Sequence, residues 1–251
     1  MTSLVDILGV RVDDVTHSEA LARCITLLAD PQPRYVVTPN PEFVVLARRD
    51  PEFRRILNAS DLAIPDGGGL LLAARLFGTP LREQVRGTDL CYLLIEEAVR
   101  RQWRVFLLGA APGVADAAAR RLRQRFAGLR ISGTFAGDAS QAGDADTRAA
   151  IQRAGCCDLL FVAYGASKQE RWIDRNVALL DVGLAMGVGG VFDFMSGRVR
   201  RAPYAVRRLG VDWLWRLVVQ PSRIKRQGRT IPVFLGLALR EATRRRGLRV
   251  A

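Results

Sequence analysis

Short apolar runs alternate with amphipathic stretches along most of the chain. The apolar runs are four to six residues long, which is the length of buried strands. They cover residues 34–38, 62–65, 105–109, 131–135, 159–164 and 184–188. The stretches between them, such as 88–101 and 113–126, combine helical spacing of apolar residues with good helix formers. This alternation predicts a mostly parallel sheet that is buried on both faces.

The predicted fold class is therefore α/β, with a Rossmann-like sheet flanked by helices. In open parallel sheets, ligands bind beyond the carboxyl ends of the strands. Polar residues and glycines in that position are the first candidates for a binding site. They are Thr38 and Asn40, Asp66 with the glycines after it, Gly109, the segment 165–169 and the segment 187–193.

The chain changes character after Asp193. Residues 198–251 contain 15 basic and two acidic side chains, so they carry the whole formal charge of +13. We predict a catalytic domain at 1–197 and a basic helical appendage at 198–251. Within the appendage, residues 209–219 and 231–246 have helical patterns, with Thr230 as the expected cap of the second helix. A short apolar helix with a basic end is typical of a membrane interface.

Composition excludes several kinds of chemistry. The chain has one histidine and four cysteines without a CxxC pair, which is too few ligands for a zinc site. The single His17 also argues against a Ser-His-Asp or Cys-His mechanism, so any general base is expected to be a carboxylate. Neither the segment 109–113 nor the segment at 187 forms GxGxxG, and a P-loop is absent. We expect no metal and no cofactor.

Each candidate motif also has a purely structural interpretation. Asp66, in the sequence IPDGGG, suits a base that takes a proton from a sugar hydroxyl, but it also suits a helix cap. Thr38 and Asn40 flank a proline and are typical of a turn. Ser167 and Glu170 have the spacing of a capping box, although the same helix start can hold a phosphate. The glycines at 187–190 also suit a tight junction between a strand and a helix.

Taken together and in order, these motifs resemble one family. The blocks are TPNPEFVVLAR, NASDLAIPDGGGL, VRGTDL, VFLLGAAPG, FVAYGASKQERWI, GVGGVFDFMSGRVRRAP and LGVDWLWRLVVQPSRIKR. From about Thr38 to Arg226 they are similar to the WecG/TagA/CpsF glycosyltransferases, glycosyltransferase family 26. The resemblance implies transfer of N-acetylmannosamine or a related hexose from a UDP-sugar to a polyprenyl-diphosphate-linked sugar. It also implies inversion at the anomeric carbon without a metal ion.

The resemblance assigns roles to particular residues. It implies that Asp66 is the catalytic base, and it places Thr38, Asn40, Arg86 and Gln169 in the substrate pocket. Block position makes Gly109, Tyr164, Gly165, Gly189, Gly190 and Asp193 candidates for binding the nucleotide. Arg216, Arg223 and Arg226 match basic positions that are thought to meet the lipid-linked acceptor at the membrane. Ser167 and Tyr164 depart from the family pattern, which affects donor details more than reaction type.

The expected partners are a UDP-sugar, a polyprenyl-diphosphate-linked saccharide and an anionic membrane surface, with no nucleic acid. The N-terminus lacks a secretory signal and no apolar stretch is long enough to span a bilayer, so we expect a cytoplasmic protein peripheral to the inner face of the membrane. Two other classes stay open at this point: a Rossmann-like methyltransferase or oxidoreductase, and a nucleic-acid-binding protein that uses the basic tail. A homo-oligomer also stays open.

Overall fold

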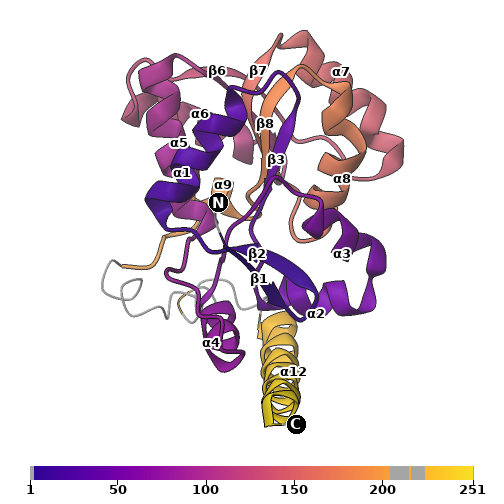
Figure 1. Ribbon diagram of the computed structural model, residues 1–251. Coiled ribbons are helices and arrows are strands. Elements are labelled where there is room, and N and C mark those ends of the chain that lie inside the picture. Colours follow the sequence, from indigo (N-terminus) through magenta and orange to yellow (C-terminus); the bar gives the residue numbers. More distant parts are fainter. Residues whose placement is uncertain (1–2, 204–214, 216–223, 251) are drawn as a thin grey trace.

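The computed structural model describes residues 3–203, 215 and 224–250. Its centre is a six-stranded sheet in the order β4-β3-β8-β7-β5-β6, and every neighbouring pair is parallel. The strands are β3 (Arg34–Val37), β4 (Leu62–Ala63), β5 (Arg104–Gly109), β6 (Arg130–Phe135), β7 (Cys157–Ala163) and β8 (Val182–Gly187). Helices flank this sheet (Figure 1). The predicted α/β fold is confirmed, as are the predicted strands.

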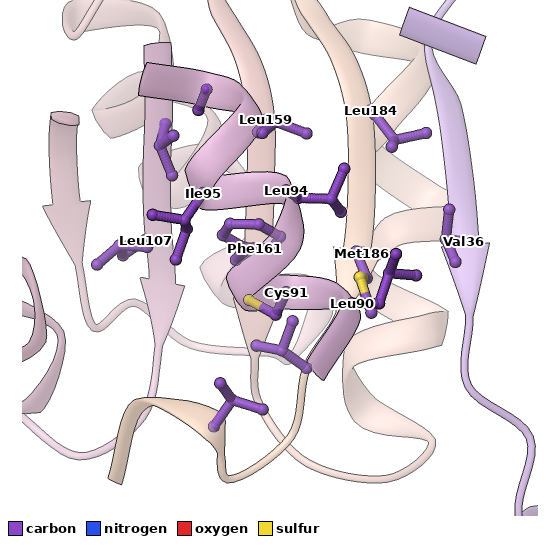
Figure 2. Close-up of a cluster of buried hydrophobic side chains, with 14 of the residues drawn as sticks. Val36, Leu90, Cys91, Leu94, Ile95, Leu107, Leu159, Phe161, Leu184 and Met186 are labelled. Carbon is purple, nitrogen blue, oxygen red and sulfur yellow. The ribbon is translucent and has the colours of Figure 1, made fainter. Parts of the chain in front are cut away.

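The two faces of the sheet are covered by different helices. One face packs against α1 (His17–Leu28), α5 (Gly87–Arg101), α6 (Val114–Arg125) and α9 (Val191–Met195), and the other against α7 (Asp144–Arg153) and α8 (Lys168–Asn176). Short 3₁₀ turns occur at Gln141–Gly143 and Val177–Leu179. Figure 2 shows Leu94 of α5 lying among strand residues that include Phe161 and Met186. Alternate residues of β7 thus enter opposite cores, as the period of a strand requires.

A third core lies below the sheet. It joins an antiparallel hairpin of β1 (Leu4–Ile7) and β2 (Val10–Asp13) to α2 (Pro41–Arg49), α3 (Pro51–Asn58), α4 (Gly68–Leu76) and α12 (Ile224–Val250). Asp13 fastens the hairpin to the sheet, because its Oδ2 accepts a hydrogen bond from the backbone N–H of Ala63 at 2.8 Å. The sequence analysis did not predict this hairpin, whose two strands have four residues each.

The C-terminal helix corrects one expectation. Thr230 does not cap it, because α12 begins at Ile224 and continues through Pro232. A proline inside a helix removes one backbone hydrogen bond. Here Phe234, Ala238 and Ala242 are buried against α2 and α4, and this packing offsets that loss.

Several predictions for the basic segment concern residues outside the described part of the chain. Arg216, Arg223 and most of the predicted helix at 209–219 lie outside the described residues, as does the side chain of Arg226 in the first turn of α12. The division into domains at 197 and 198 stays a prediction. Figure 1 shows α12 extending away from the sheet toward the C-terminus.

Candidate active site

A cavity of about 430 Å³ opens at the carboxyl edge of the sheet. Its walls come from the segments that follow β3, β4, β7 and β8, from the turn before α5, and from α12. Along the chain, β4 is added on one side of β3, whereas β5 to β8 lie on the other side. Open α/β sheets bind ligands at such a switch point. The cavity therefore lies where the topology predicts it.

Most of the predicted site residues meet in this cavity. Those that line it are Thr38, Asn40, Asp66, Arg86, Gly165, Gln169, Gly189 and Gly190. They come from five separate segments of the chain, and the fold brings them together. Gly109, Tyr164 and Asp193 are not among the lining residues.

Asp66 is linked directly to the turn that carries Arg86. Its Oδ2 accepts a hydrogen bond from the backbone N–H of Gly87 at 3.2 Å. Asp66 does not cap α4, because the residue at that position is Gly67, whose φ is +123°. The interpretation of Asp66 as the cap of α4 is therefore wrong. The carboxylate instead contacts the start of α5.

Gly87 makes that contact sterically feasible. A Cβ at this position would lie 2.9 Å from Thr38 Cγ2 and 3.4 Å from Asp66 Oδ2. The first distance is too short for a real contact, so a larger residue would push the turn away from β3 and from the carboxylate. Glycine here keeps the Asp66 carboxylate and the Arg86 backbone on adjacent parts of the cavity wall.

The cavity is suited to an anion. Arg86 is half-buried at its wall, with Nη2 3.5 Å from Oε1 of Gln84. A second guanidinium, that of Arg201, also lines it and forms an ion pair with Asp89. The helix α4 begins at the wall without a side-chain cap, and its first residues, Gly68 and Gly69, line the cavity. Guanidinium groups and helix N-termini together favour a phosphate or diphosphate.

Gln169 fastens two of the loops that form the cavity. Its Oε1 accepts hydrogen bonds from the backbone N–H of Gly165 at 3.2 Å and of Gly189 at 2.9 Å. Its Nε2 donates to Oε1 of Glu170 at 2.7 Å. The side chain is 2% exposed, so it positions the loops after β7 and β8 from behind the wall. Ser167 has a φ of +63° and its side chain does not cap α8, which overturns the capping-box interpretation.

Glu170 is fully buried behind the same wall. Burial raises the pKa of this carboxyl group to about 7, and the hydrogen bond from Gln169 opposes the rise. Oε2 has no hydrogen-bond partner among the described residues. The charged form is therefore less stable inside the fold than in water.

Replacing Glu170 with glutamine is expected to stabilise the protein at pH 8 and to have little effect at pH 5. The folded-state pKa of about 7 lies above the ordinary value of 4.5, so the cost of burying the charge is absent in acid and grows as pH rises toward 7. The full difference corresponds to about 3 kcal/mol in the free energy of unfolding. Thermal unfolding of E170Q and wild type at both pH values measures it. A variant that gains nothing between pH 5 and pH 8 would contradict the raised pKa.

Asn40 and Thr38 were predicted either to form a turn or to line a substrate pocket. The Oδ1 of Asn40 caps α2 by accepting hydrogen bonds from the backbone N–H of Glu42 at 2.9 Å and of Phe43 at 3.1 Å. The turn interpretation is thus confirmed for that oxygen, while the residue still lines the cavity. Thr38 is 8% exposed and packs beside Gly87. Both residues shape the wall around Asp66.

The three other residues that were predicted to bind the nucleotide do not line the cavity. Gly109 ends β5, and a Cβ there would lie 2.9 Å from the backbone of Ala163, so this glycine allows two strands to approach each other. Tyr164 turns to the opposite face of the sheet, where its ring packs edge-on against Trp172. Asp193 lies in α9 between the lining residues Val191 and Phe194. Their assignment to the nucleotide stays a prediction.

Comparison with known proteins assigns the chain to a family. The sequence profile of the glycosyl transferase WecG/TagA/CpsF family matches residues 5–248. The chain belongs to this family. An N-acetylglucosaminyldiphosphoundecaprenol N-acetyl-beta-D-mannosaminyltransferase of Bacillus spizizenii is 33% identical over 226 residues, which are 90% of this chain and 84% of that protein. The Staphylococcus aureus protein with the same description is 31% identical over 238 residues, 93% of this chain and 91% of that protein.

Membership of the WecG/TagA/CpsF family makes the protein a glycosyltransferase, so the predicted family and enzyme class are confirmed. In this member, several cavity residues went unnoticed in the sequence. Arg201 belongs to a block that carried the resemblance, but nothing in its pattern shows that it faces the cavity. Ile231, Phe234 and Leu235 of α12 also line the wall. They lie within an apolar run that predicted a helix but did not indicate what that helix covers.

Proposed function

We propose that the protein transfers N-acetylmannosamine or a related hexose from a UDP-sugar to a polyprenyl-diphosphate-linked sugar, with inversion and without a metal ion. The acceptor is inferred from the relatives, which are N-acetylmannosaminyltransferases that act on N-acetylglucosaminyldiphosphoundecaprenol. The observation that carries the proposal is the pairing of Asp66 with the Arg86–Gly87 turn in one cavity. A base and a diphosphate-binding cation are the two groups that such a displacement needs.

In the proposed reaction, Asp66 removes the proton from an acceptor hydroxyl. The hydroxyl oxygen attacks the anomeric carbon of the donor from the face opposite the diphosphate. The bond from that carbon to the diphosphate oxygen breaks as the new glycosidic bond forms, which inverts the carbon. UDP leaves with its additional negative charge, and Arg86 with the backbone amides at the start of α4 stabilises it. The guanidinium groups of Arg86 and Arg201 supply the positive charge that a metal ion supplies in other transferases.

Binding of uridine nucleotides tests the donor part of the proposal. Thermal unfolding of the full chain is measured with UDP, ADP, GDP and a panel of UDP-sugars. UDP and at least one UDP-sugar are expected to raise the midpoint temperature in a concentration-dependent way, because a ligand that binds only the folded state stabilises it. ADP and GDP at the same concentrations control for unspecific binding of diphosphates. Equal responses to all nucleotides, or no response to any, would refute a uridine-specific pocket.

We further propose that the protein works at a membrane surface. Three residues of α12 give the cavity an apolar side, and Val233, Leu235 and Leu239 of that helix are exposed. Arg240 and Arg244 follow on the same helix. Within the described part of the chain, no helix combines enough length with enough apolar character to cross a bilayer. Sedimentation with anionic vesicles is expected to be weakened by L239E, and a variant that binds as well as wild type would refute this role of α12.

A further inference from the structure

The single histidine of the chain lies beside the turn that carries Arg86. His17 is the first residue of α1. Its Nε2 accepts a hydrogen bond from the backbone N–H of Arg86 at 3.3 Å. On the other side of the ring, Nδ1 lies 2.6 Å from Oε1 of Glu83. The same carboxylate accepts a hydrogen bond from the backbone N–H of His17 through Oε2, at 3.1 Å. Glu83 therefore holds both the ring and the backbone of His17.

These partners determine the protonation state of the ring. A backbone N–H can only donate, so Nε2 must be the unprotonated nitrogen that faces Arg86. A carboxylate can only accept, so Nδ1 must carry the proton that faces Glu83. An imidazolium would direct a second N–H at the amide of Arg86. The two contacts together are those of the tautomer that carries its proton on Nδ1.

His17 is connected to the site through two consecutive backbone amides. The N–H of Arg86 is held by His17, and the N–H of Gly87 is held by Asp66. Arg86 is the N-cap residue of α5, and its side chain makes no capping hydrogen bond to the helix. His17 therefore anchors the start of this helix from outside the cavity, while Asp66 anchors it from inside.

We propose that His17 is a positioning residue for glycosyl transfer: as the neutral Nδ1–H tautomer selected by Glu83, it holds the Arg86–Gly87 turn against Asp66. Glu83 is the charged side chain in contact with the ring. The nearby Glu19 is engaged by Arg82, which also binds Asp14. The proposal rests on the proposed function, because it concerns the arginine assigned to the diphosphate.

The tautomer can be observed directly because the chain has one histidine. In untagged protein labelled with ¹⁵N-histidine, long-range ¹H–¹⁵N spectra at pH 7.5 contain the ring of His17 alone. The expected spectrum is that of a neutral ring protonated at Nδ1, and E83A is expected to lose this preference. A ring protonated at Nε2, or an imidazolium, would overturn the proposal. This measurement does not depend on activity or on the stability of a His17 variant.

Kinetics test the positioning role. H17L removes the acceptor for the Arg86 amide and is expected to lower kcat/KM for the sugar donor about tenfold, as the loss of one hydrogen bond to a catalytic turn does. H17Q provides an amide oxygen near the position of Nε2 and is expected to recover to within about threefold of wild type. Wild-type kcat/KM in H17L, or an H17Q variant no better than H17L, would contradict the proposal. If the proposed function itself is wrong, wild type shows no transfer while the Nδ1–H tautomer is still observed.

Discussion

The Asp66→Asn variant is expected to lose sugar transfer by a factor of about 10² to 10⁴ in kcat, which is the usual contribution of a general base. Asparagine is nearly isosteric and still offers an oxygen to the N–H of Gly87, so the contact at 3.2 Å can persist. What the variant lacks is a group that accepts the proton of the acceptor hydroxyl. UDP binding is therefore expected to stay within about twofold of wild type, because a base contributes little to binding of the leaving group.

A matched control lies at the other end of the same strand. Asp61 precedes β4, whereas Asp66 follows it, and Asp61 forms an ion pair with Arg34 at 3.0 Å. D61N changes a carboxylate of the same element without touching the cavity, so it is expected to lower thermal stability and leave kcat near the wild-type value. Initial rates of transfer and UDP titrations on all three proteins separate the outcomes. A D66N variant with more than about a tenth of the wild-type kcat would remove Asp66 from its role.

The Arg86→Ala variant is expected to lower kcat/KM by a factor of about 10² to 10³, comparable with the loss of one preorganised group that stabilises developing charge. Unlike D66N, it is also expected to weaken UDP binding, because in the proposed reaction the guanidinium contacts the diphosphate before and after transfer. R86K keeps the charge but not the planar pair of donors, so an intermediate loss is expected. The two variants thus separate the contribution of charge from that of bidentate geometry.

Arg54 provides the control for this series. It is an exposed arginine of α3 that does not line the cavity. R54A removes one positive charge from the protein and is expected to leave both kcat/KM and UDP affinity unchanged. An R86A variant that retained wild-type UDP affinity and lost less than about threefold in kcat/KM would contradict the role of Arg86. Arg201 would then be the next candidate for the cation that stabilises the leaving UDP.

The sequence predicted the strands of the sheet but not the order in which they pair. Apolar runs of strand length identify buried strands, because a parallel sheet is covered on both faces. The same pattern contains no information on strand order. Gly109 is the last residue of a correctly predicted strand, yet β5 is separated from β8 by β7, and Gly109 does not line the cavity. Position at the end of a strand therefore predicts a binding residue only where strand order brings that end to the cavity.

The sequence also did not predict where individual side chains lie. Tyr164 and Gly165 are adjacent in sequence just after β7, but the ring of Tyr164 packs against Trp172 of α8, whereas Gly165 lines the cavity. Asp66 was predicted because it follows an apolar run of strand length and matches the family motif, and the structure places it after β4 in the cavity wall. The partners that fix it could not be predicted, since Gly87 and His17 reach the site only through tertiary contacts. Arg201 and Phe234 are further examples.

Transfer between defined substrates examines the proposed reaction as a whole. The purified full chain is incubated with UDP-N-acetylmannosamine and a synthetic prenyl-diphosphate-linked N-acetylglucosamine, and both UDP and the lipid-linked product are quantified. We expect one UDP to be released for each lipid-linked disaccharide formed, with the new glycosidic bond inverted relative to the donor. A protein that binds UDP but forms no lipid-linked disaccharide from this donor or from any other UDP-hexose would contradict it.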